Sequence, residues 1–158
     1  LLMRDIRKLQ RKAKRENMTL AIRLNGTSDI QWEKQYSDFG TPTIWPQSTL
    51  IEKFPTVQFY DYTKIPRRNV PANYHLTFSY SGVAEFQPVV EKQLEHKPDT
   101  NLAVVFGSEL PATFYGREVV NGDASDIRFL DDHFVVVGLT AKGKAKTDRS
   151  GFVVTTGA

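Results

Sequence analysis

Arg23-Leu24-Asn25-Gly26-Thr27-Ser28-Asp29 is the stretch from which the fold class is predicted. It follows the apolar residues 20–22, so it is typical of a strand that ends in polar groups at the edge of a sheet. Four further apolar runs also turn polar where they end: 57–60, 74–78, 102–106 and 134–137. Five such strands predict an α/β fold, a predominantly parallel sheet or a partial (β/α) barrel whose ligand site is the carboxyl rim of the strands.

Composition sets the class of protein. The chain has 158 residues, of which 40% are hydrophobic and 25% charged, which is typical of one globular domain over residues 1–158. It contains no cysteine, which excludes disulfides, thiolate metal sites and cysteine nucleophiles within these residues. Because no apolar run approaches roughly 18 residues and no signal peptide is recognisable, we expect a cytoplasmic protein without a membrane partner.

An amphipathic helix is predicted over residues 1–17, since Leu2, Ile6, Leu9 and Ala13 recur at three- and four-residue spacing. The chain starts in mid-helix without a capping residue, so we expect it to be a fragment of a longer protein. The other face of the helix carries seven basic residues: Arg4, Arg7, Lys8, Arg11, Lys12, Lys14 and Arg15. This face either grips phosphates or acidic lipid, or is a solvated helix face, as charge runs usually are. The net charge of +3 is compatible with nucleic acid without requiring it.

The remaining elements follow from periodicity and turn signals. Strands are predicted over 19–25, 57–62, 74–79, 102–106 and 134–139, with a short final strand over 151–154. Helices are predicted over 47–54 and 84–97, and a small hairpin is predicted to pair 115–120 with 127–130 around Asn121-Gly122. The connection 63–73 is an extended loop with a basic tip, Arg67-Arg68. Aromatic residues in the long segment 30–55 either pin it to the core or form a lid: Trp32, Tyr36, Phe39 and Trp45.

Polar residues at the predicted strand ends are the candidate site. Candidates for ligand binding are Arg23, Asn25, Ser28, Asp61, Thr77, Ser79, Ser81, Lys142 and Lys144. Candidates for proton transfer are Asp29, Tyr62, Lys64 and His75. We expect Arg23 to be buried or half-buried, with Asp29 or Asp61 as its partner. We also expect a group of these residues to converge at one end of the sheet: Arg23, Asn25, Asp61 or Tyr62, His75 and Lys142. Asp123 and Asp126 are better explained by turn chemistry than by a cation site.

The role of His75 has two interpretations, because this residue shares one face of a predicted strand with Thr77 and Ser79. In the first reading a neutral ring satisfies a polar interior. In the second it is an acid, a base or a metal ligand near neutral pH. The sequence leaves both open.

Several phrases together resemble a domain of unknown function encoded in bacteriophage and plasmid genomes, related to a family named after a mycobacteriophage gene product. The phrases are 23–29, 57–64, 73–79, 121–123 with 126–130, and 137–145 with 150–154. The match runs in order along nearly the whole chain. The whole is similar to the partial barrel of radical-SAM enzymes, and the resemblance implies that longer members carry a cysteine-rich segment upstream. An iron–sulfur cluster would then be held by that segment, with no cofactor in these residues.

Three hypotheses of function remain. The first is an enzyme-like domain that binds a phosphate-bearing or nucleotide-like ligand at the rim, with Lys142 and Lys144 neutralising phosphate. The second is a phage or plasmid accessory protein that binds nucleic acid or a host protein in the host cytoplasm, with an anti-defence or replication-associated role and no chemistry of its own. The third is a purely structural or assembly role.

Overall fold

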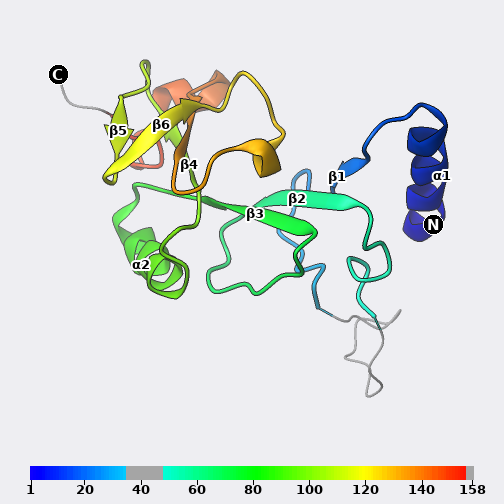
Figure 1. Ribbon diagram of the computed structural model, residues 1–158. Helices are drawn as coiled ribbons and strands as arrows, with labels where there is room; N and C mark the ends of the chain where they lie inside the picture. The colour runs from blue at the N-terminus through cyan, green and yellow to red at the C-terminus, as the bar shows by residue number, and fades with distance from the viewer. Residues whose placement is uncertain (35–47, 156–158) are drawn as a thin grey trace. The chain divides into compact units, whose positions relative to one another are not determined.

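The chain forms an α/β fold in the computed structural model, which describes residues 1–34 and 48–155 (Figure 1). Seven strands form an open, mostly parallel sheet in the order β1-β2-β3-β4-β7-β6-β5. The strands are β1 (Ala21–Arg23), β2 (Gln58–Thr63), β3 (Tyr74–Ser79), β4 (Leu102–Phe106), β5 (Thr113–Phe114), β6 (Arg117–Asn121) and β7 (Val136–Thr140). The predicted α/β class with a parallel sheet and a small β insertion is therefore confirmed.

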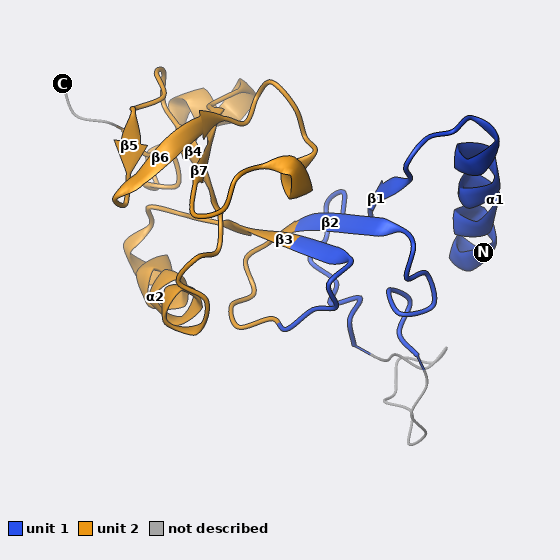
Figure 2. Cartoon of the chain, in the orientation of Figure 1, with its two compact units in different colours: residues 1–61, 69–75 blue, residues 62–68, 76–158 orange. Residues whose placement is uncertain are grey.

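The chain divides into two compact units (Figure 2). Unit 1 comprises Leu1–Asp61 and Asn69–His75, and unit 2 comprises Tyr62–Arg68 and Leu76–Ala158. Of the predicted aromatic segment, Tyr36, Phe39 and Trp45 lie outside the described residues. Among the residues described, no helix is both long and apolar enough to cross a membrane.

Helix α1 (Leu2–Arg15) of unit 1 forms as its periodicity predicts, with Ile6 as its buried residue. Asn17 ends it in the left-handed region, at φ 52°. The amide of Met18 then donates to the carbonyl of Ala13, and the amide of Asn17 donates to that of Lys14. This is the Schellman arrangement, which satisfies carbonyls at the end of a helix and redirects the chain.

Three strand segments of unit 1 pair in parallel. In β1 and β2, Ile22 lies opposite Phe59 and Arg23 lies opposite Tyr60. The amide of Phe59 donates to the carbonyl of Asn73 at 2.7 Å. In a parallel pair this bond places Phe59 beside Tyr74, the first residue of β3. The rings of Phe59 and Tyr74 meet edge to face, 6.5 Å apart, and both side chains are buried. The face of unit 1 that carries Phe59 and Tyr74 is therefore its buried face.

Unit 2 has an apolar core. In β4 and β7 the residues pair from Leu102 opposite Val136 to Phe106 opposite Thr140. Helix α2 (Gln87–His96) contributes Val90, while Val89 and Leu94 pack at the edge of the core. The buried cluster consists of Phe78, Tyr80, Val90, Leu102, Val104, Phe106 and Val136. The short helix η1 (Ala84–Phe86) precedes α2, so the predicted helix over 84–97 is found in two pieces.

Two predicted elements are wrong. Residues 50–53 form turns in place of the expected helix over 47–54: Thr49 and Glu52 exchange the two hydrogen bonds of a capping box, but Pro55 follows within one turn. The hairpin is β5–β6, and it turns at Tyr115-Gly116, whose φ angles are 54° and 70°. These angles suit the tight turn of a two-residue hairpin.

Residues after β6 also differ from the prediction. Asn121 ends β6, and the amide of Gly122 donates to the carbonyl of Gly138 of β7. A side chain at position 122 would meet Val137 at 2.4 Å, so glycine is required where the chain leaves β6. The expected partner strand 127–130 contains the short helix η2 (Arg128–Leu130). The final strand over 151–154 is reduced to a bridge between Val154 and Phe106.

Candidate functional site

A buried carboxylate organises the polar side of unit 1. Asp61 of β2 has no exposed surface. It accepts hydrogen bonds from the amide of Asn25 at 2.8 Å, from Asn25 Nδ2 at 3.2 Å and from the hydroxyl of Tyr74 at 2.8 Å. Burying a carboxylate is costly unless donors replace its hydration shell, and these donors do so.

Asn25 extends this network into the loop that follows β1. Its Oδ1 accepts hydrogen bonds from the hydroxyl of Ser28 at 2.9 Å, from the amide of Ile30 at 3.2 Å and from Nε1 of Trp32 at 3.0 Å. Its Nδ2 also donates to the carbonyl of Ile30 at 3.0 Å. The structure thus brings together the predicted site residues Asn25, Ser28 and Asp61, and their bonds hold the loop in place.

Other predicted residues lie on the opposite face of the same strands. Arg23 pairs with Tyr60 across β1 and β2, and the register set by Phe59 and Asn73 places His75 beside Tyr60. Arg23 is exposed, whereas Tyr60 and His75 are half-buried. The expectation that Arg23 is buried or half-buried is therefore wrong, because β1 lies at the edge of the sheet. Asp29 is half-buried in the loop after β1.

Several of the predicted site residues in unit 2 are buried or contact aromatic rings. The Lys64 ammonium lies 5.1 Å from the Phe152 ring centroid and 5.9 Å from that of Phe86. Thr77 and Ser81 are buried, and Ser79 is half-buried. The predicted basic tip is also divided: Arg68 is buried and donates to the hydroxyl of Thr63, while Arg67 pairs with Glu95 at the surface.

The carboxyl ends of β6 and β7 carry an exposed ion pair. Lys142 Nζ lies 2.8 Å from a carboxylate oxygen of Asp123, and the amide of Thr140 donates to the other oxygen at 2.9 Å. The hydrogen bond from Lys142, followed by that from Thr140, lowers the pKa of Asp123 to about 2. Lys144 lies exposed in the next turn, η3 (Gly143–Thr147).

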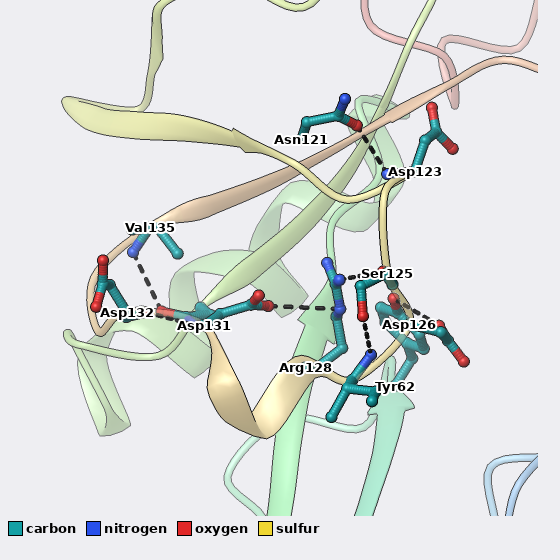
Figure 3. Close-up of polar contacts among 11 residues, drawn as sticks. Tyr62, Asn121, Asp123, Ser125, Asp126, Arg128, Asp131, Asp132 and Val135 are labelled. Atoms are coloured by element: carbon teal, nitrogen blue, oxygen red, sulfur yellow. Dashed lines mark hydrogen bonds and ion pairs between the residues drawn. The ribbon is translucent and has the colours of Figure 1, made fainter.

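Unit 2 also contains a buried cation, Arg128, that the sequence analysis did not single out (Figure 3). Arg128 of η2 is 2% exposed and donates to the carbonyl of Ser125. Its Nε lies 3.4 Å from a carboxylate oxygen of Asp131, while its Nη1 makes no hydrogen bond. Burial raises the pKa of Asp131, against the opposing effect of Arg128. In the same loop Asp126 accepts a hydrogen bond from the hydroxyl of Tyr62 at 3.3 Å.

Cations are most concentrated on α1. All seven of its basic side chains are exposed, and its acidic neighbours Asp5 and Glu16 pair with Arg4 and Arg15 at 3.7 and 3.5 Å. The helix carries one acidic residue, Asp5, so its formal charge is +6, from seven basic residues less one acidic. In the whole chain 21 basic and 18 acidic residues give +3, so the residues outside α1 sum to −3.

The residues that were expected to converge at one end of the sheet do not all lie on one face of unit 1. Asn25 and Asp61 lie on the buried side, whereas Arg23 and His75 lie on the other face, and Tyr62 and Lys142 belong to unit 2. The sequence analysis did not single out Tyr60 as a site residue. The alternation along β2 indicates that Tyr60 shares the half-buried face with Gln58 and Tyr62. The residues beside Tyr60 on the neighbouring strands depend on the strand register, which the local sequence does not give.

The side chains that could bind a metal ion are scattered in the described part of the chain. The chain has no cysteine to supply a thiolate. In residues 1–34 and 48–155, no group of three or more histidine, aspartate or glutamate side chains is placed to hold a metal ion. The described residues therefore do not fit an iron–sulfur cluster.

Comparison with models of known protein families gives a match over almost the whole chain. A family described as Gene product 88 matches residues 1–156. Neither a curated protein nor a solved structure matches the chain.

Proposed function

The chain belongs to the Gene product 88 family, a phage-type family, and we propose that it is a nucleic-acid-binding protein that grips the phosphate backbone with the basic face of α1. The observation that carries this proposal is the concentration of a +6 charge on one exposed helix of a chain whose other residues sum to −3. Clustered cations on one element are the electrostatic footprint of a phosphate-binding surface.

The geometry of α1 suits a phosphate backbone. A helix of 14 residues is about 21 Å long, a length over which one DNA strand presents about six phosphates. Arg7, Arg11 and Lys14 are spaced by four and three residues, so they share one face. The helix is held to unit 1 by buried Ile6 and by a hydrogen bond from Gln10 to Thr56 at 3.3 Å.

The surface is not neutralised by its own carboxylates. The ion pairs of Arg4 and Arg15 are exposed, and such pairs contribute little and are screened by salt. A solvated helix face with no partner would need no such excess of one sign. Because binding rests on the release of a few counterions, we expect it to be weak and strongly salt-dependent.

The test is fluorescence anisotropy of labelled 20-nucleotide DNA, single-stranded and duplex, over a range of salt concentrations. The triple variant R7Q/R11Q/K14Q should reduce the slope of log K against log salt by about 2 on the single strand and by about 2.7 on the duplex. The matched control K92Q/K97Q/K146Q removes three exposed cations from unit 2 and should leave the slope unchanged. Equal slopes for both variants, or tight binding that survives high salt, would contradict the proposal.

A second candidate is a phosphate-bearing small molecule at the carboxyl end of β7. The observation that favours it is the bond by which Asp123 fixes Lys142 at the start of a turn that also carries Lys144 and Lys146. Titration with inorganic pyrophosphate, followed by NMR, should shift the amides of Gly143–Thr147 first. The variant K142M/K144M should lose these shifts, and K92M/K97M should keep them.

A further inference from the structure

One face of the strands of unit 1 carries an aromatic ring between two nitrogen-bearing side chains. Arg23 of β1 lies opposite Tyr60 of β2 in the parallel register. The bond from the amide of Phe59 to the carbonyl of Asn73 sets β3 so that His75 lies on the other side of Tyr60. Paired residues of neighbouring strands share a face, so Arg23, Tyr60 and His75 form one row across three strands. We call these three residues the Tyr60 row.

The Tyr60 row lies on the face of β2 opposite its fully buried side chains. Along β2 the side chains alternate between half-buried and buried, from Gln58 to Thr63. Phe59 and Asp61 are fully buried on one side, whereas Tyr60 keeps part of its surface on the other. Arg23 is exposed and His75 is half-buried. A planar ring and two nitrogen-bearing side chains are thus within reach of solvent on a pleated surface.

The buried face holds this row in a fixed place. Behind Tyr60, the Asp61 carboxylate accepts hydrogen bonds from Asn25 of the loop after β1 and from Tyr74 of β3. Tyr74 also packs edge to face on Phe59. These contacts join all three strand segments of unit 1, so little conformational freedom is lost when a ligand binds the opposite face.

The chemistry of the row fits an unpaired nucleobase. Aromatic side chains on a sheet surface stack with bases that are not paired, and neighbouring arginine and histidine side chains contact phosphates or stack in turn. Bases in a duplex are already stacked and cannot lie on such a ring. Five residues, 16–20, separate α1 from β1, so the basic helix and the row are joined by a short stretch of chain in one unit.

We propose that the Tyr60 row is a base-stacking surface, and that single-stranded nucleic acid is the form that this protein prefers. This inference rests on the proposed function, because α1 supplies the phosphate contacts. It adds a separate requirement, which is that removal of one ring weakens binding to single strands and leaves duplex binding unchanged.

The experiment measures the affinity of a labelled 20-nucleotide DNA strand and of the same strand annealed to its complement. Y60A should weaken single-strand binding about tenfold or more, the loss expected when one base–aromatic stack is removed. It should leave duplex affinity and the salt slope unchanged, and Y60F, which retains the ring, should bind like wild type. Y115A removes an exposed tyrosine from unit 2 and is the matched control.

A second variant, at an exposed position, tests the surface even if Y60A does not fold. Arg23 is exposed, so R23Q should preserve the thermal unfolding curve, weaken single-strand binding and lower its salt slope by about 0.7. Unchanged single-strand affinity in Y60A and R23Q, with the α1 triple variant still lowering the slope, would overturn the stacking surface and leave the proposed function standing. If wild-type protein binds neither DNA at low salt, both proposals fail.

Discussion

Unit 1 and unit 2 differ in what they bury and in the charge that they carry. Residues 1–61 and 69–75 contain ten basic and seven acidic residues, whereas residues 62–68 and 76–158 contain eleven of each. Unit 1 therefore carries the whole net charge of +3. Its strands pack around a buried carboxylate, while unit 2 packs β4 and β7 into an apolar cluster. The excess of positive charge is therefore confined to unit 1, whereas unit 2 contains the apolar cluster.

The two units also bury charge in different ways. The Asp61 carboxylate of unit 1 accepts hydrogen bonds from an amide N–H, an Asn side chain and a tyrosine hydroxyl. The Arg128 guanidinium of unit 2 has the Asp131 carboxylate 3.4 Å from its Nε, and its Nη1 makes no hydrogen bond. We therefore expect the unit 1 network to be the more damaging one to break.

The largest expected effect is that of D61A. This change leaves three buried donors of Asn25 and Tyr74 without their acceptor, at roughly 1–3 kcal/mol each, so we expect a loss of about 4 kcal/mol in the free energy of unfolding. D126A is the matched control, because Asp126 also accepts a tyrosine hydroxyl but is exposed, and it should cost less than about 0.5 kcal/mol.

Urea unfolding gives the two free energies, and amide hydrogen exchange locates the damage. In D61A the amides of β2 and of the loop after β1 should exchange faster, while those of β4 and β7 change less. If D61A and D126A cost the same, the contrast between the polar and the apolar unit would be lost.

An intermediate effect is expected from R128M. The substitution leaves the partly buried Asp131 carboxylate without its cation, and breaking a buried pair typically costs about 3 kcal/mol or more. The double variant R128M/D131L removes both charges and should recover most of that loss. A double variant as unstable as the single one would mean that Arg128 stabilises unit 2 through contacts other than Asp131.

Local patterns in the sequence predict much of this fold. The spacing of Leu2, Ile6 and Leu9 predicts α1, and the alternation over residues 74–79 predicts β3 with its observed bounds. The hairpin was misplaced because Asn121-Gly122 is the strongest turn signal in the segment. The observed turn places Tyr115 at φ 54°, a conformation that tyrosine rarely adopts.

The site was harder to predict than the strands. Arg23, His75, Asn25 and Asp61 were recognised as polar residues near strand ends, but the face on which each lies depends on strand register. Register is a long-range property: the bond between Phe59 and Asn73 decides which residue of β3 neighbours Tyr60. Arg128 was missed because a buried cation has no local sequence pattern that separates it from a solvated one.

The smallest expected effect concerns the exposed pair of unit 2. The pKa of Asp123 is lowered to about 2, chiefly by the hydrogen bond from Lys142 and then by that from the amide of Thr140. A carboxyl whose folded-state pKa is depressed stabilises the fold above its unfolded value of 3.8, and this contribution is lost as the pH falls from about 4 to about 2. Removing Lys142 should therefore raise the pKa of Asp123 toward 3.8 and shrink that contribution.

The measurement is an NMR titration of the Asp123 side-chain carboxyl carbon in wild type, K142M and K144M. K142M should titrate at higher pH than wild type. K144M should not, because Asp123 is bonded to Lys142 Nζ and the Thr140 amide. Since the pair is exposed, the free energy of unfolding at neutral pH should change by less than about 0.5 kcal/mol. An Asp123 that still titrates near 2 in K142M would show that the Thr140 amide and the rest of the β6–β7 edge hold the carboxylate without the lysine, which would leave Lys142 available to a phosphate.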